Sequence, residues 1–196
     1  MDIPHIASVL AQGGVALLPT DTVYGLAARP DRPEAIRKIF ALKARPLAKN
    51  LPLLIASRQD LAALGAQITP RVEALLESPW MPGPLTLVLP IDPARAPDWL
   101  TERSEIAIRI PADDNLRALL RETGPLATTS ANASGQSTPA TPDAILRQIT
   151  AAPDIIVRDG PRSGEASTLI DTQTTPFHVL RRGALSDADL TRIIAL

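Results

Sequence analysis

The chain has 196 residues, of which 45 % are apolar and 21 % are charged, and its formal net charge is −1. This balance is typical of a globular protein with a substantial core, and a nearly neutral chain has no overall attraction to nucleic acid or to an anionic membrane. Cysteine is absent, which excludes disulfides, a cysteine nucleophile and thiolate metal sites.

No apolar run approaches the roughly 20 residues that a membrane-spanning helix needs. The N-terminal segment M-D-I-P-H-I-A lacks the basic region and long apolar core of a signal peptide. We therefore expect a cytoplasmic protein without a membrane span. Because no repeat or long linker divides the chain, we also expect one domain over residues 1–196.

Hydrophobic periodicity, together with Pro, Gly and capping residues, predicts helices that alternate with short strands. Helices are expected at residues 3–12, 33–43, 59–64, 70–76, 113–121 and 142–149, and after Ser186. Strands are expected at residues 15–18, 51–56, 85–89, 106–110, 125–129, 155–157, 168–171 and 178–180. Asp31 and Ser186 are candidate N-caps. The pattern indicates an α/β fold, a twisted mixed β-sheet with helices on its faces.

The stretch from Val15 to Lys49 has a strand, a Thr/Asp-rich loop and then a helix that ends at two cations, Lys43 and Arg45. Lys43 lies on the apolar face of this helix, so we expect its ammonium to point toward the body of the protein. One interpretation is that the two cations only offset the negative end of the helix dipole. The other is a phosphate site that faces the loop at the strand end. This stretch alone leaves both interpretations open.

Further polar groups follow other predicted strands, where open α/β sheets bind ligands. The loop 130–135 (S-A-N-A-S-G) combines hydroxyls, an amide and a flexible backbone, although an ordinary turn has the same composition. Arg109 lies on the polar side of an alternating strand and is either solvated or positioned to bind a carboxylate. The loop 163–168 (S-G-E-A-S-T) and Arg181 are further candidates.

Common catalytic motifs are missing from the sequence. It contains no P-loop, no dinucleotide-binding glycine motif, no H-E-x-x-H and no G-x-S-x-G. His5 and His178 are the two histidines, and we interpret both as ordinary surface or packing residues. The candidate site is therefore one of hydroxyls, amides and cations.

Taken together, the motifs resemble those of the YrdC/TsaC family of threonylcarbamoyl-AMP synthases. They are P-T-D-T-V-Y-G-L, K-A-R-P, I-R-I-P, T-S-A-N-A-S-G, S-T-L-I-D and L-R-R-G-A, in this order, and they span about residues 5–185. The length resembles the short, single-domain form. Two departures are Leu51, which separates Asn50 from Pro52, and Asp21, where some relatives have Glu.

The resemblance implies a YrdC-like fold around a basic cavity and a reaction of L-threonine, bicarbonate and ATP to threonylcarbamoyl-adenylate and pyrophosphate. Mg²⁺ is expected on the triphosphate. The implied nucleotide contacts are Lys43, Arg45, Lys49, Ser130, Asn132 and Arg181, with Lys43 and Arg45 also stabilising the transition state. The implied threonine contacts are Thr20, Thr22, Arg109 and Ser167. The product would pass to a separate transferase complex that modifies an adenosine beside the tRNA anticodon.

Two other functions remain as alternatives. An RNA-binding module, with possible weak contact to RNA, is disfavoured by the net charge of −1 and by the scarcity of aromatic residues for base stacking. A carbamoyltransferase-related domain of the kind found in hydrogenase maturation is disfavoured because such chains carry cysteine-rich zinc motifs. We expect the synthase.

Overall fold

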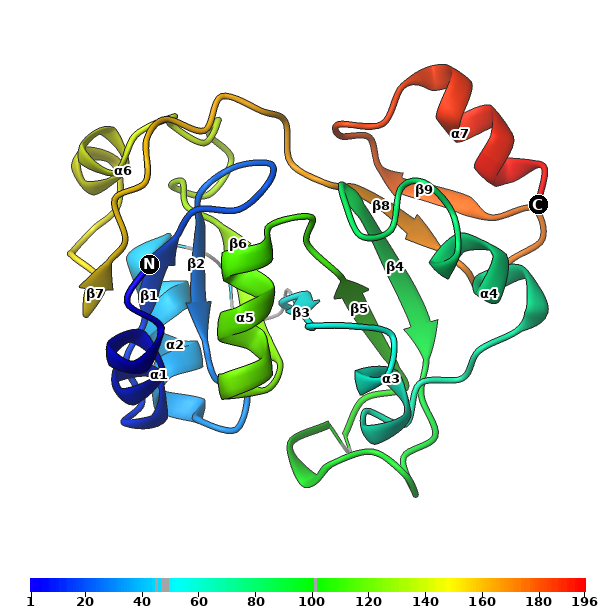
Figure 1. The fold of residues 1–196 in the computed structure, drawn as a ribbon, viewed down its shortest axis with the longest axis horizontal. Coiled ribbons are helices and arrows are strands. Elements are labelled where there is room, and N and C mark those ends of the chain that lie inside the picture. The colour runs from blue at the N-terminus through cyan, green and yellow to red at the C-terminus, as the bar shows by residue number, and fades with distance from the viewer. Residues whose placement is uncertain (45, 47–49, 101) are drawn as a thin grey trace.

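The computed structural model describes residues 1–44, 46, 50–100 and 102–196. These residues form a twisted, mixed sheet with helices on its faces (Figure 1), which confirms the expected fold class. The helices are α1 (Ile3–Ala11), α2 (Pro33–Leu42), α3 (Asp60–Ala63), α4 (Pro70–Leu76), α5 (Asp114–Thr123), α6 (Pro142–Gln148) and α7 (Asp187–Ile194). The strands are β1 (Ala16–Leu18), β2 (Gly25–Ala28), β3 (Leu53–Leu54), β4 (Leu85–Pro90), β5 (Glu105–Arg109), β6 (Leu126–Ser130), β7 (Ile155–Ile156), β8 (Thr168–Asp171) and β9 (His178–Arg181).

The strand order across the sheet is β7-β1-β2-β6-β3-β5-β4-β8-β9. Parallel pairs join β7 to β1, β3 to β5 and β4 to β8, and the other neighbours are antiparallel. The two-residue strand β3 is therefore the link between one group of strands, β7-β1-β2-β6, and the other, β5-β4-β8-β9.

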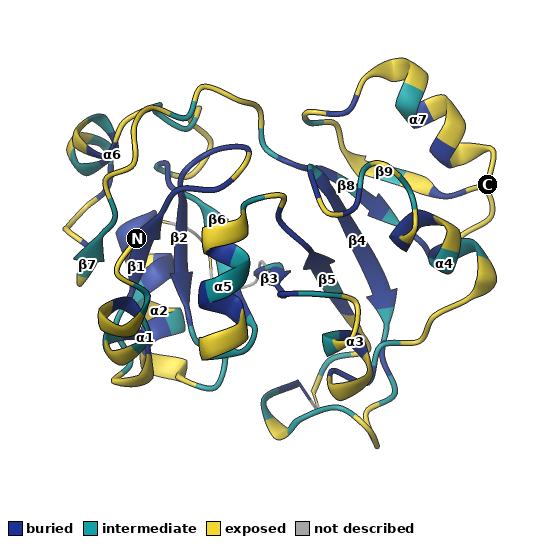
Figure 2. Ribbon diagram, in the orientation of Figure 1, coloured by how far each residue is buried: buried dark blue, intermediate teal, exposed yellow. Residues whose placement is uncertain are grey.

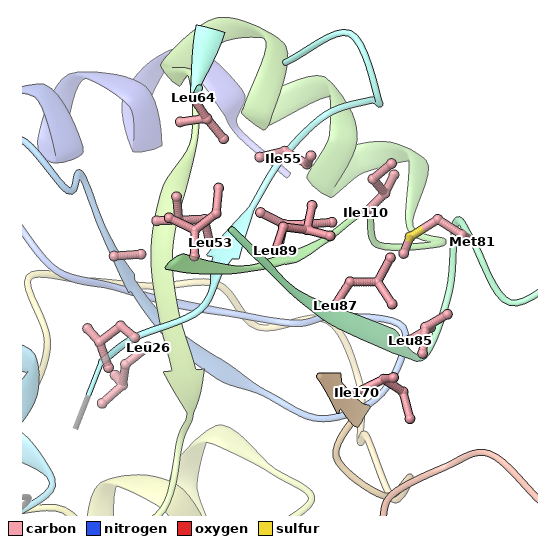
Figure 3. Close-up of a cluster of buried hydrophobic side chains, with 14 of the residues drawn as sticks. Leu26, Leu53, Ile55, Leu64, Met81, Leu85, Leu87, Leu89, Ile110 and Ile170 are labelled. Carbon is pink, nitrogen blue, oxygen red and sulfur yellow. The ribbon is translucent and has the colours of Figure 1, made fainter. Parts of the chain in front are cut away.

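Apolar side chains form clusters on both faces of the sheet. One cluster packs Leu54 and Leu126 against α1 and α5, with Leu10 and Leu119 fully buried. A larger cluster runs along β3, β4 and β5 on the other face, where leucines and isoleucines interdigitate (Figure 3). The central strands are accordingly buried, whereas the edge strands β7 and β9 and the outer sides of the helices are more exposed (Figure 2).

Capping interactions explain where several helices begin. The side chains of Thr69, Asp113 and Thr141 each accept a backbone N–H from the first turn of α4, α5 and α6. Ser186 caps α7 and forms a reciprocal capping box with Asp189. The prediction for Asp31 was wrong, because its carboxylate pairs with Arg29 at 2.8 Å and the N-cap of α2 is Arg32.

Two strands differ from the sequence-based expectation: β2 was not predicted, and β3 is shorter than the predicted strand 51–56. The β2 sequence, G-L-A-A, has no β-branched residue, and it is a strand because β1 and β6 pair with its two edges. β3 covers only Leu53–Leu54 of the expected 51–56, and the chain turns just beyond the apolar run, where the Ser57 N–H donates to the Asp60 carboxylate at 3.0 Å. Among the described residues, no helix is long and apolar enough to cross a membrane.

Candidate functional site

A cavity of ≈ 270 Å³ opens between the two groups of strands that β3 joins. Its described lining comes from the loop after β1, from β3 to β6, and from β8 and β9. Six of the predicted site residues line it: Thr20, Thr22, Arg109, Ser130, Ser167 and Arg181. Side chains that are far apart in the sequence thus meet around one space.

The loop after β1 forms one wall, and the hydroxyl of Thr20 organises it. Thr20 Oγ1 accepts the N–H groups of Thr22 and Val23, at 3.1 and 3.2 Å, and donates to the Val23 carbonyl at 2.7 Å. This is the local hydrogen bonding that makes threonine favourable in turns. Thr22 is buried, and its hydroxyl lies 3.0 Å from Thr20 Oγ1. The wall therefore has a fixed backbone and presents a threonine hydroxyl to the cavity.

Arg109 is a buried cation at the end of β5, with three different partners. Its Nε donates to the Gly83 carbonyl at 2.9 Å, one terminal nitrogen donates to Thr22 Oγ1 at 2.9 Å, and the other pairs with Asp21 at 2.8 Å. Burial lowers the pKa of Arg109, and the Asp21 carboxylate opposes this shift. As the strand alternation predicts, Ala107 lines the cavity beside it, while Ile106, Ile108 and Ile110 enter the core.

The opposite wall is formed by Ser167 and Arg181. Ser167 is buried, and its hydroxyl lies 2.7 Å from that of Thr86 on β4. Arg181 donates to the Ser167 carbonyl at 2.7 and 3.2 Å and to Ser167 Oγ at 3.2 Å. A side chain at Gly183 would not fit here, since its Cβ would lie 2.1 Å from the Ala166 carbonyl oxygen. The bonds to Ser167, the residue directly before β8, therefore hold Arg181 at the cavity edge.

Lys43 and Asn132 lie behind the cavity wall. Lys43, the C-cap of α2, is only 2 % exposed, and its ammonium donates to the carbonyls of Ser130 and Asn132 and to Asn132 Oδ1. The Asn132 amide donates in turn to the carbonyls of Ala133 and Gln136, at 2.8 and 2.7 Å. The expectation that Lys43 points into the protein is confirmed. It supports the loop that carries Ser130.

Two other predicted nucleotide contacts, Arg45 and Lys49, lie outside the described residues. Asn50, which follows them, lines the cavity.

Sequence reasoning missed several lining residues. Thr86 and Val88 share the cavity side of β4, and the lone threonine in L-T-L-V-L was the available signal. Arg103 and Glu105 line the other end of the cavity, where burial lowers the pKa of Arg103 and Gln173 donates to Glu105 at 2.7 Å. Neither residue belongs to a recognisable motif. With three arginines and one glutamate, the described lining is basic.

Comparisons with known proteins agree with this geometry. The family model Sua5/YciO/YrdC, described as "Telomere recombination", matches residues 8–183. Relatives from Pyrococcus abyssi and Bacillus subtilis, both named threonylcarbamoyl-AMP synthase, are 34 % identical over 191 residues and 32 % identical over 195. The alignments cover 96 % and 98 % of this chain but 56 % of each relative, so the chain spans about half the length of the curated relatives it matches.

Solved structures show the same similarity. The structure of P. abyssi Sua5 complexed with L-threonine superposes with a TM-score of 0.86 at 33 % identity, covering 98 % of this chain and 57 % of that one. The structure of Escherichia coli YciO has a TM-score of 0.81 at 24 % identity, covering 94 % of this chain and 90 % of that one, and it shares the fold.

Proposed function

Because the chain belongs to the Sua5/YciO/YrdC family, we propose that it is a threonylcarbamoyl-AMP synthase, acting as a single domain over residues 1–196. It joins L-threonine, bicarbonate and ATP into threonylcarbamoyl-adenylate and releases pyrophosphate. The observation that carries this proposal is the convergence of Thr22, Arg109, Ser167 and Arg181 on one cavity. Two relatives are named for this activity, and the similar P. abyssi Sua5 structure is a complex with L-threonine.

In this proposal L-threonine binds between the two walls of the cavity. Arg109 pairs with its carboxylate, while the hydroxyls of Thr20, Thr22 and Ser167 contact its polar groups. A guanidinium has five N–H donors, and the three bonds described above leave donors on both terminal nitrogens for a carboxylate. Because Asp21, Thr22 and Gly83 already fix the guanidinium plane, binding costs little side-chain entropy.

ATP binds at the adjoining edge, where Ser130 and Arg181 line the cavity. Asn132 and Lys43 hold the Ser130 loop from behind, and Lys43, Arg45 and Lys49 supply positive charge for the phosphates. Mg²⁺ enters with the triphosphate. The phosphates and water supply most of its ligands.

The chemistry requires positioning and positive charge. The amine of threonine and bicarbonate form a carbamate with loss of water, a carbamate oxygen attacks the α-phosphorus, and the bond to pyrophosphate breaks. No covalent enzyme intermediate is needed, so hydroxyls and cations suffice. The mixed anhydride then passes to a separate transferase for the N⁶-threonylcarbamoyladenosine modification of tRNA.

Release of pyrophosphate from ATP tests this proposal. We expect release that requires both L-threonine and bicarbonate, and markedly slower release with L-serine, which lacks the methyl group. A folded, ATP-binding protein without threonine-dependent release would overturn the synthase. Transfer from carbamoyl phosphate would then favour the carbamoyltransferase. RNA binding that weakens steeply with salt, without ATP consumption, would favour the RNA-binding module.

A further inference from the structure

The connection from β7 to β8, residues 157–167, crosses from one group of strands to the other above the loop after β1 (Figure 1). Most of its residues are exposed, and its last residue, Ser167, is buried at the cavity. We call residues 157–167 the strap. Its contacts with the loop after β1 decide how firmly that wall of the cavity is held.

Arg162 is the side chain by which the strap holds this loop. Its Nε donates to the Thr20 carbonyl at 3.0 Å. One terminal nitrogen donates to the Asp159 carbonyl at 2.6 Å, and the other pairs with the Asp159 carboxylate at 2.7 Å. The backbone N–H of Arg162 donates to the Ala140 carbonyl at 2.8 Å. All three guanidinium nitrogens are engaged, so the planar fork is fixed in direction as well as in place.

Tyr24 and Gly164 also hold the strap close to the loop. The buried Tyr24 hydroxyl donates to the Gly160 carbonyl at 2.8 Å and accepts the Asp159 N–H at 3.1 Å. Gly164 lies directly on the loop backbone, because a Cβ at this position would be 2.6 Å from the Thr22 carbonyl oxygen. The strap is therefore in van der Waals contact with the residue whose hydroxyl faces Arg109.

These contacts form one continuous path into the cavity. Asp159 orients Arg162, Arg162 holds the Thr20 carbonyl, and Thr20 Oγ1 binds the N–H of Thr22. Thr22 Oγ1 then accepts a hydrogen bond from Arg109. Removal of the Arg162 side chain would thus change the positions of Thr22 and Arg109, which contact the amino acid in the proposed function.

We propose that Arg162 is a positioning residue for the amino-acid subsite: it acts through the Thr20 carbonyl to hold Thr22 and Arg109 in the geometry that binds L-threonine. This inference rests on the proposed function for its substrate, but the path itself is independent of it. Arg162 does not line the described cavity, so its effect is on binding through the loop and not on the reacting atoms.

The test compares Arg162→Ala with Arg158→Ala. Arg158 is on the same strap and pairs with Asp143 at 2.8 Å, but both partners are exposed and neither touches the loop. Hydrogen exchange of residues 19–26, measured without substrates, should become about tenfold faster in Arg162→Ala, the effect of one lost charge-assisted hydrogen bond. Exchange in Arg158→Ala should match the wild type.

Kinetics and binding complete the test. We expect Arg162→Ala to raise the KM for L-threonine about tenfold and to change kcat less than the KM, with partial recovery in millimolar guanidinium chloride. Equal exchange and equal threonine KM in the two variants would overturn the inference, as would a loss confined to kcat. A third outcome separates the two proposals. If hydrogen exchange is faster in Arg162→Ala but the wild-type protein shows no threonine-dependent release of pyrophosphate, Arg162 still holds the loop and the proposed function is wrong.

Discussion

Lys43 is a buried ammonium with a structural task that is distinct from any contact with phosphate. It is 2 % exposed and donates to carbonyls on either side of Ala131, so it fixes the turn that leads out of β6. Buried acceptors that lose their donor retain the full cost of desolvation. The same side chain therefore contributes to the stability of the fold and to the shape of the candidate nucleotide edge.

Replacing Lys43 with methionine should lower both stability and turnover. We expect the free energy of unfolding to fall by about 2–4 kcal/mol, because two or three buried oxygens lose a charged donor while the apolar stem is kept. Urea denaturation, together with pyrophosphate release at a temperature where the variant is folded, measures the two effects. Lys38→Met on the same helix is the control, since its partly exposed pair should contribute less than about 1 kcal/mol. Unchanged stability in Lys43→Met would show that the carbonyl contacts are dispensable.

At the scale of elements, Asp154 joins three pieces of secondary structure. It precedes β7, and its carboxylate accepts the Val15 N–H ahead of β1 at 2.7 Å and the Lys38 ammonium of α2. Burial alone would raise the pKa of Asp154, but these hydrogen bonds outweigh it and the pKa is lowered. A lowered pKa means that the native state favours the carboxylate, so the associated stability exists above the ordinary aspartate range and is lost as pH falls through the native value.

Asp154→Asn should therefore destabilise the protein in a pH-dependent way. At pH 6–7 we expect a loss of roughly 1 kcal/mol or less, because the side chains of the pair are more than a third exposed and solvent screens them. The difference from wild type should shrink as pH falls below about 4, where the wild-type carboxylate also becomes neutral. Urea unfolding over a pH series measures this, and a difference that stays constant down to pH 2.5 would contradict the role of charge.

The elements that the sequence predicts well are those with their own local signals. α4 has the expected bounds because Thr69 and Pro70 mark its first turn. β8 has the expected bounds because a short apolar run marks the strand. β2 could not be predicted, since only pairing with β1 and β6 makes its G-L-A-A segment a strand. For the candidate site, the motifs predicted Thr22, Arg109 and Ser167, and all three line the cavity. The motifs did not identify Arg162, because its partner Thr20 is 142 residues away and no local pattern marks the contact.

At the scale of the whole molecule, the cavity lies where a single short strand joins the two groups of strands. β3 is two residues long, and it is the strand that pairs with both β6 and β5. Thr22 and Ser130 approach the cavity from one group of strands, and Thr86, Arg109 and Ser167 from the other. A ligand that touches both groups therefore adds contacts between strands that are otherwise joined through β3. Such a ligand binds the native state and not the unfolded chain, so it must raise stability.

This arrangement predicts that substrates stabilise the fold against heat. Near 100 times its Kd, L-threonine should add about 2.7 kcal/mol, which for a chain of this size raises Tm by roughly 5–10 °C; ATP should add a separate shift. Arg109→Lys keeps a cation but loses the fork that binds Asp21, Thr22 and a carboxylate together, so we expect it to abolish the threonine shift and to retain the ATP shift. Scanning calorimetry with each ligand measures both. Loss of the ATP shift with the threonine shift intact would mean that Arg109 belongs to the nucleotide subsite, and the proposed positions of the two ligands would have to be exchanged.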